Sequence, residues 1–133
     1  MNDKTTWFLA LSAVIALFLV YASGQWIVIG GHILPVETVK LDPPMDNSIG
    51  QMESNQSVYF AHDYLAGKYI APLKMNDEVT VINKFVVTKY RVYDTVLYSR
   101  QVTQNIAYDN FPDMILQTCV GSKILIVKLM EEK

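Results

Sequence analysis

The sequence predicts an all-β domain, a closed or partly closed β-barrel, preceded by one N-terminal transmembrane helix. Two observations lead to this prediction. Residues 7–31 contain no charged side chain. From residue 58 onward, short runs rich in Val, Ile, Tyr and Thr alternate with turn-forming residues, as in strands that bury one face. A barrel buries such strands without leaving exposed sheet edges.

Length, charge and cysteine content limit the function classes. A chain of 133 residues has room for one domain with a modest core. A formal net charge of −2 argues against nucleic acid as a partner. The single cysteine excludes an intramolecular disulfide and a zinc site with several thiolates. His32 and His62 stand at no recognisable ligand spacing, so we predict neither a metal site nor a cofactor.

The N-terminal segment predicts a membrane anchor. Residues 7–22 form a sixteen-residue apolar run, slightly shorter than the roughly 20 residues that a bilayer requires. An extension through residue 29 reaches that length and places Trp7 and Trp26 like interfacial anchors. A cleaved signal peptide is the alternative, because small residues at 22–24 suit a cleavage site. We therefore assign residues 1–31 to an anchor or signal peptide. The domain would then lie outside the cytoplasm on a single-pass cell-membrane protein.

The remainder divides into a tether and a core. Residues 32–57 mix short apolar pieces with Pro, Asp, Asn and Gly, which predicts a tether with one strand near 36–41 that Pro43-Pro44 ends. Residues 58–133 form the predicted barrel core. Its expected strands are 58–62, 78–82, 85–98 (two strands or one bent strand), 114–119 and 123–129. Asp77 and Glu78 are expected in a turn, because two adjacent acids do not make a calcium site.

The segment "CVGSK" (119–123) holds the only cysteine. It predicts a hairpin with a three-residue loop, 120–122, in which Cys119 and Lys123 face one another across the strands. A neighbouring cation favours the reactive thiolate and can stabilise an oxyanion formed beside the sulfur. The alternative is that Cys119 is a small buried residue and that Lys123 extends to solvent.

His62 ends the apolar run "SVYFAH" and precedes the polar turn "DYLAG". A histidine at such a boundary is partly exposed, which suits a general acid or base. One upstream histidine and one downstream cysteine form a candidate base and nucleophile. Their separation in the sequence leaves open whether they meet in space.

At these residues the chain resembles the sortase family. The stretch "VYFAHDYLAGKYIAPLKMNDEVTVI" is similar to the sortase pattern of a strand ending in Ala/Gly-His, a polar residue, a Gly turn and an "N-D-x-V-x-V" strand. "YRVYDTVL" resembles the Tyr-x-Val strand that follows it, and "ILQTC" matches the signature Leu-x-Thr-Cys. The resemblance covers roughly residues 58–129 and keeps the family's order of motifs.

This resemblance implies a cysteine transpeptidase on a sortase-like β-barrel, acting without a cofactor. Cys119 would attack the carbonyl of a sorting motif to form a thioacyl enzyme, and His62 would act as general acid and then base. Thr118 would lie near the substrate, and Lys123 stands where the family has an arginine that holds the substrate. The implied partners are a secreted protein with a C-terminal sorting motif and a cell-wall precursor or pilin amine.

The chain departs from the family pattern at that arginine. Lysine is a point charge that lacks the planar fork of guanidinium. Either Lys123 serves in its place, or Arg100 or Arg91 reaches the substrate from a neighbouring strand, or activity is lost. The alternative function is therefore a catalytically weak or inactive barrel that binds an extracytoplasmic peptide or protein. Hydrolysis without transfer is a further possibility.

Overall fold

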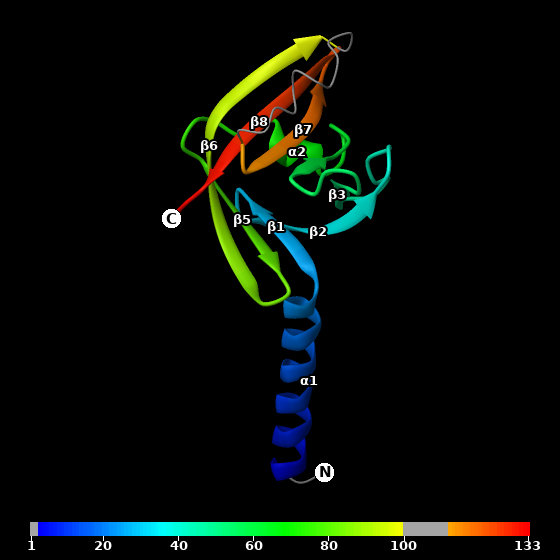
Figure 1. The fold of residues 1–133 in the computed structure, drawn as a ribbon. Coiled ribbons are helices and arrows are strands. Elements are labelled where there is room, and N and C mark those ends of the chain that lie inside the picture. Colours follow the sequence, from blue (N-terminus) through cyan, green and yellow to red (C-terminus); the bar gives the residue numbers. More distant parts are fainter. Residues whose placement is uncertain (1–2, 100–111) are drawn as a thin grey trace.

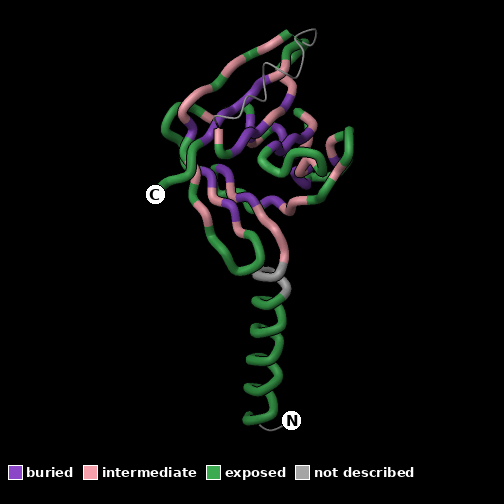
Figure 2. The backbone as a smooth tube through the Cα atoms, viewed as in Figure 1, coloured by how far each residue is buried: buried purple, intermediate pink, exposed green. Residues whose placement is uncertain are grey.

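A long N-terminal helix projects from a β-barrel in the computed structural model, which describes residues 3–99 and 112–133. Helix α1 spans Asp3–Ser23 and stands away from the barrel (Figure 1). Its residues 3–19 are exposed along the whole length (Figure 2). Within the described residues, no helix combines the length and the apolar character that crossing a membrane requires.

The described strands close into one barrel in the order β1-β2-β3-β4-β7-β8-β6-β5. Two neighbouring pairs are parallel, β2 with β3 and β4 with β7, and the other pairs are antiparallel. A four-residue helix, α2 (Gly67–Ile70), follows β4. The strands are β1 (Gln25–Ile29), β2 (His32–Val39), β3 (Ile49–Met52), β4 (Val58–Phe60), β5 (Glu78–Asn83), β6 (Val86–Ser99), β7 (Met114–Val120) and β8 (Lys123–Glu131).

The barrel prediction is confirmed, and several strands begin and end near the predicted residues. β5, β7 and β8 lie within two residues of their predicted bounds. The run at 85–98 is one strand, β6, and it bends where its register against β8 shifts between Val92 and Asp94. This shift is a β-bulge, which increases the local twist and lets one strand contribute to two parts of a barrel wall.

The predicted boundaries of the anchor and tether are wrong. Residues 25–29, assigned to the membrane span, form β1, which pairs with both β2 and β5 and so completes the barrel. Ile27 and Ile29 are buried in the core. The segment 32–57 is more than a tether, since it contributes β2 and β3 to the sheet.

The barrel interior is mainly apolar, with the Thr118 hydroxyl and a polar group of side chains around Tyr59 among its polar exceptions. Alternate residues of the strands point inward and form the main core cluster, as period-2 strands require. At this cluster, the amides of Gln25 and Gln51 donate hydrogen bonds of 3.2 Å and 3.1 Å to the Tyr59 hydroxyl oxygen. Burial raises the pKa of Tyr59 above its ordinary value of 10.0, and neighbouring Tyr90 raises it further.

We expect this phenol to make the fold sensitive to high pH. The folded protein holds the Tyr59 proton more tightly than the unfolded chain. Above pH 10 the unfolded state therefore loses protons first, and the free energy of unfolding falls as pH rises. Tyr59→Phe is expected to flatten this decline, measured by denaturant unfolding between pH 8 and pH 11. Tyr64→Phe, at an exposed position, is the control, and an equal effect of both substitutions would contradict the assignment.

Candidate active site

The parallel pairing of β4 with β7 brings the predicted base and nucleophile together. Val58 pairs with Ile115, and the register continues through Phe60 and Gln117. The Ala61 amide donates to the Gln117 carbonyl at 3.1 Å, so the ladder runs past the end of β4. Extended by two residues, this register would set His62 opposite Cys119. Both residues come at the carboxyl ends of their strands and on the outer face of the barrel.

Thr118 fixes this arrangement from inside the barrel. Its side chain is buried, and its hydroxyl donates a 2.9 Å hydrogen bond to the carbonyl of Ala61, the residue before His62. The bond therefore ties the strand that carries the cysteine to the backbone that carries the histidine. The sequence placed Thr118 near a substrate, whereas its described contact is to the protein's own backbone.

Gly67 closes the turn that follows His62. The His62 carbonyl accepts hydrogen bonds from the amides of Leu65, at 3.0 Å, and Gly67, at 2.9 Å. A Cβ atom at residue 67 would lie 2.1 Å from the Thr118 Oγ1 atom and 2.5 Å from the His62 carbonyl oxygen. Only glycine fits between these two groups. The sequence predicted a Gly-containing turn here, but no local signal showed that its glycine packs against Thr118.

The His62 imidazole is half-buried and stacks on Tyr64, with the ring centroids 5.2 Å apart and an interplanar angle of 25°. The stack limits the orientations that the imidazole can adopt while leaving it partly open to solvent. Cys119 is also half-buried and forms no disulfide. Sequence analysis did not identify Tyr64, because an aromatic residue two positions after a histidine has no distinctive spacing.

The hairpin register differs from the predicted one. Val120 pairs with Lys123 and Cys119 pairs with Ile124, so the turn has two residues, Gly121 and Ser122. Gly121 takes a positive φ of 61°, as the first central residue of such hairpin turns does. The prediction that Cys119 and Lys123 face one another is therefore wrong. The two Cβ atoms lie on opposite faces of the sheet, because side chains alternate along a strand.

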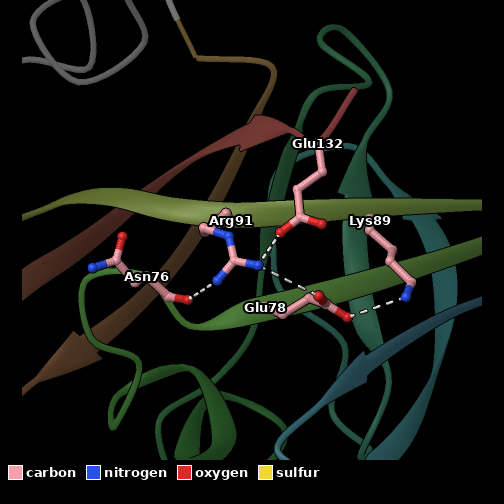
Figure 3. A network of polar contacts seen from close by, with 5 residues as sticks. All are labelled: Asn76, Glu78, Lys89, Arg91 and Glu132. Carbon is pink, nitrogen blue, oxygen red and sulfur yellow. Dashed lines mark hydrogen bonds and ion pairs between the residues drawn. The ribbon is translucent and has the colours of Figure 1, made fainter.

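Arg91 and Arg100 were the two candidates to replace the substrate-binding arginine of the family, and the structure describes only Arg91. Arg100 lies outside the described residues. Arg91 lies on the outer face of β6, where it donates a 2.7 Å hydrogen bond to the Asn76 carbonyl and pairs with Glu78 and Glu132 (Figure 3). Its guanidinium is thus held in a surface network with partners of its own.

Two other polar features lie apart from this pair of residues. Asp77 accepts a 2.8 Å hydrogen bond from the Lys74 amide, which agrees with the predicted turn. A pocket of about 390 Å³ lies beside α2, where His32 stacks on Tyr69, and its lining includes neither Cys119 nor His62. Over residues 3–99 and 112–133, no group of three or more His, Cys, Asp or Glu side chains could hold a metal ion.

Comparison with solved structures identifies the fold. The chain is similar to a lid mutant of sortase A from Corynebacterium diphtheriae, with 19% identity, a TM-score of 0.69, and coverage of 84% of this chain and 70% of that one. A sortase C from Clostridium perfringens with the C-terminal cell wall sorting motif gives 19% identity and a TM-score of 0.66, over 81% and 69% of the two chains.

Sortase C from Streptococcus pneumoniae gives 16% identity and a TM-score of 0.69, over 83% and 68% of the two chains. No protein-family model and no curated protein matches the sequence. The protein therefore has a sortase-like fold, as the sequence motifs implied.

Gly67→Ala is expected to destabilise the protein by about 1–3 kcal/mol, the usual cost of overpacking a tight site. The added methyl group must displace either the Thr118 hydroxyl or the His62 carbonyl. Chemical denaturation measures the change in the free energy of unfolding. Thr118→Ala in the same background removes the closer of the two contacts and is expected to restore only part of the loss, since the His62 backbone remains. Wild-type stability of Gly67→Ala would show that the turn is not packed as described.

Proposed function

We propose that the protein is a sortase-like cysteine transpeptidase in which Cys119 is the nucleophile and His62 the general acid and base. The observation that carries the proposal is the β4–β7 register, which sets the two residues at adjacent strand ends on one face. The sortase-like fold and the Leu-x-Thr-Cys signature support it. Residues 62 and 119 are far apart in sequence, and a fold that joins their strands in parallel supports a common location for this pair.

In the first half-reaction, the Cys119 thiolate attacks the carbonyl carbon of the scissile peptide bond of a sorting motif. The tetrahedral intermediate collapses as the carbon–nitrogen bond breaks, and the His62 imidazolium gives its proton to the leaving amine. The products are a thioester on Cys119, neutral His62 and a released peptide amine.

In the second half-reaction, the amine of a cell-wall precursor or pilin attacks the thioester carbonyl. His62 accepts the proton that the nucleophile loses, and the Cys119 sulfur leaves as thiolate. One peptide bond is broken and one is formed, so no oxidant or cofactor is required. His62 is an imidazolium before the first half-reaction, a neutral imidazole beside the thioester, and an imidazolium again after the second, so its ring must be open to both amines.

The reaction is tested with sorting-motif peptides and an added oligoglycine amine. Cys119→Ala is expected to abolish turnover, and His62→Gln to lower it by roughly 10²–10⁴-fold, the usual contribution of a general acid or base. Mass spectrometry of the products separates transfer from hydrolysis. Unchanged turnover of Cys119→Ala would overturn the proposal.

Lys123 provides a sharper test of the site. Its assignment as the cation of the site stays a prediction, and its position across from Val120 argues for a small effect. We expect Lys123→Ala and Lys123→Arg to have similar turnover, within about tenfold of the wild type. Removal of a cation that held the substrate by two hydrogen bonds would lower turnover far more. A large loss in Lys123→Ala that Lys123→Arg restores would place the ammonium group at the substrate.

A peptide-binding barrel without turnover is the second candidate. The hairpin register favours it, because that register removes the predicted cation from the face that carries Cys119. Site-selective labelling of native Cys119 by iodoacetamide, lowered in His62→Gln, supports the enzyme. An inert thiol in a protein that still binds sorting-motif peptides supports the binding module.

We also propose that α1 anchors the protein in the cell membrane, with the barrel outside the cytoplasm. Large apolar side chains are exposed along the helix, among them Trp7, Phe8, Leu17 and Phe18. Full-length protein is expected to float with phosphatidylcholine vesicles on a density gradient and to stay bound in 1 M salt. A Leu9→Asp/Leu17→Asp variant should sediment, since a charge at the centre of a span costs about 3 kcal/mol. Vesicle binding that salt reverses would contradict an inserted anchor.

A further inference from the structure

The barrel end next to α1 carries an apolar outer surface. Trp26 of β1 pairs with Ile82 of β5, and Ile82 pairs with Val87 of β6. Inward-pointing Ile27 and Val81 flank this row in the sequence, so the row points outward. Phe85 lies in the turn of the β5–β6 hairpin, and Val86 follows it on the opposite face of the strand from Val87, so both faces carry an apolar side chain near the tip. We name these five residues, Trp26, Ile82, Phe85, Val86 and Val87, the hairpin-end patch.

Three of these side chains are much more exposed than large apolar side chains usually are. Phe85 is 60% exposed, Val86 62% and Val87 59%. Transfer of such side chains out of water is favourable in proportion to the apolar area that it buries, so several of them at one hairpin end indicate a surface with a partner. The patch adjoins the end of α1, because the Lys84 amide donates a 3.2 Å hydrogen bond to the Gly24 carbonyl (Figure 1).

The hairpin turn holds Phe85 at this position at a conformational cost. Lys84 and Phe85 are its two central residues, since Asn83 pairs with Val86. Their φ angles are 47° and 73°. A turn with two positive φ values strongly prefers Asn-Gly or Asp-Gly, and an aromatic residue in this region is strained. A residue kept in such a conformation points to a function for its side chain.

A group of ion pairs on the outer face of β6 marks where the apolar surface ends. Beyond Val87, Lys89 lies 3.8 Å from Glu78. Two residues further along the strand, Arg91 pairs with Glu78 and Glu132 (Figure 3). The outer face of β6 is therefore apolar beside α1 and charged beyond it. An aromatic and aliphatic edge bounded by charges, with a Trp included, is the composition of a segment at a membrane–water interface.

We propose that the hairpin-end patch docks into the interfacial layer of the same bilayer that holds α1. This inference rests on the proposed anchor. Phe85 and Val87 enter the layer, Trp26 lies at its level, and Lys84 extends to the headgroups. Backbone polar groups of the turn stay hydrated there, as they would not in the hydrocarbon core. The docked barrel has a fixed orientation, with the β7–β8 hairpin directed away from the membrane (Figure 1).

Spin labels on the full-length chain test the docking. In a Cys119→Ala background, a nitroxide is attached at Val86→Cys, which leaves Phe85 in place, or, as a matched control, at Leu41→Cys, an apolar position that is 87% exposed. The proteins are reconstituted in phosphatidylcholine vesicles and floated. We expect the label at residue 86 to collide mainly with oxygen and the label at residue 41 mainly with a water-soluble nickel chelate.

The outcomes separate the two proposals. If the protein floats and the nickel chelate reaches both labels equally, docking is overturned and the proposed anchor is supported. Failure to float overturns the anchor and docking together. A dependence of docking on anionic phosphatidylglycerol overturns an apolar contact in favour of a purely electrostatic one.

Phe85→Gly separates a role of Phe85 in docking from a role in folding, because the two roles predict effects of opposite sign. Glycine adopts a φ of 73° without strain, so this variant is expected to raise the melting temperature. In a Trp7→Phe background, where Trp26 is the remaining tryptophan, headgroup-attached quenchers report docking through its fluorescence. We expect Phe85→Gly to shift the docked-to-undocked ratio by roughly tenfold toward the undocked form, the effect of one lost Phe transfer. Unchanged quenching would overturn the proposal.

Discussion

The parallel pairing of β4 with β7 is the contact on which the candidate site depends. Parallel neighbours cannot be joined by a hairpin, so the chain between them must build β5 and β6 before β7 returns beside β4. The Thr118–Ala61 hydrogen bond links residues 57 positions apart. Gly67 lets α2 pack against this link without displacing it. The approach of the strand segments that carry His62 and Cys119 is thus a product of the whole barrel, and a change that loosens the β4–β7 pairing would separate these segments.

Strands with one polar face were predictable, and the strand with two apolar faces was not. In β5, inward Val79 and Val81 alternate with Glu78 and Thr80, and in β6, inward Tyr90 and Val92 alternate with Lys89 and Arg91, so the period of two is visible in the sequence. In β1, the inward residues Ile27 and Ile29 alternate with Trp26 and Val28, which are also apolar. The alternation is therefore lost, and residues 25–29 extend the preceding apolar run as if it were one membrane span. Trp26, one of the two outward apolar residues that hid β1, also belongs to the hairpin-end patch, so the same side chain contributes to the error and to the patch.

The motifs indicated candidate site residues, but the sequence could not fix the faces of the sheet on which they lie. A shift of one residue in a hairpin turns every side chain to the other side of the sheet. "CVGSK" is compatible with a loop of two or of three residues, since Gly121 allows a positive φ in both cases. The two-residue turn places Thr118 in the core and Cys119 outside, in agreement with the burial of both. It also places Lys123 on the face opposite the thiol. The long-range position of His62 was equally inaccessible, because it depends on the register between β4 and β7.

The two ends of the barrel are connected by a single strand. β6 starts at the hairpin-end patch with Val86 and ends with Ser99, which pairs with Lys123 at the β7–β8 turn. Its 14 residues have a contour length of at most about 46 Å, and the bulge between Val92 and Asp94 bends it. Because the barrel is closed, its two ends cannot move independently as separate sheets could. Docking of one end in the interfacial layer would therefore set the height of Cys119 above the bilayer. Substrates tethered to the same membrane would meet the thiol only if their sorting motifs lie at that height. In the proposed docked state, the length and bend of β6 would thus bear on substrate selection without contact with the substrate.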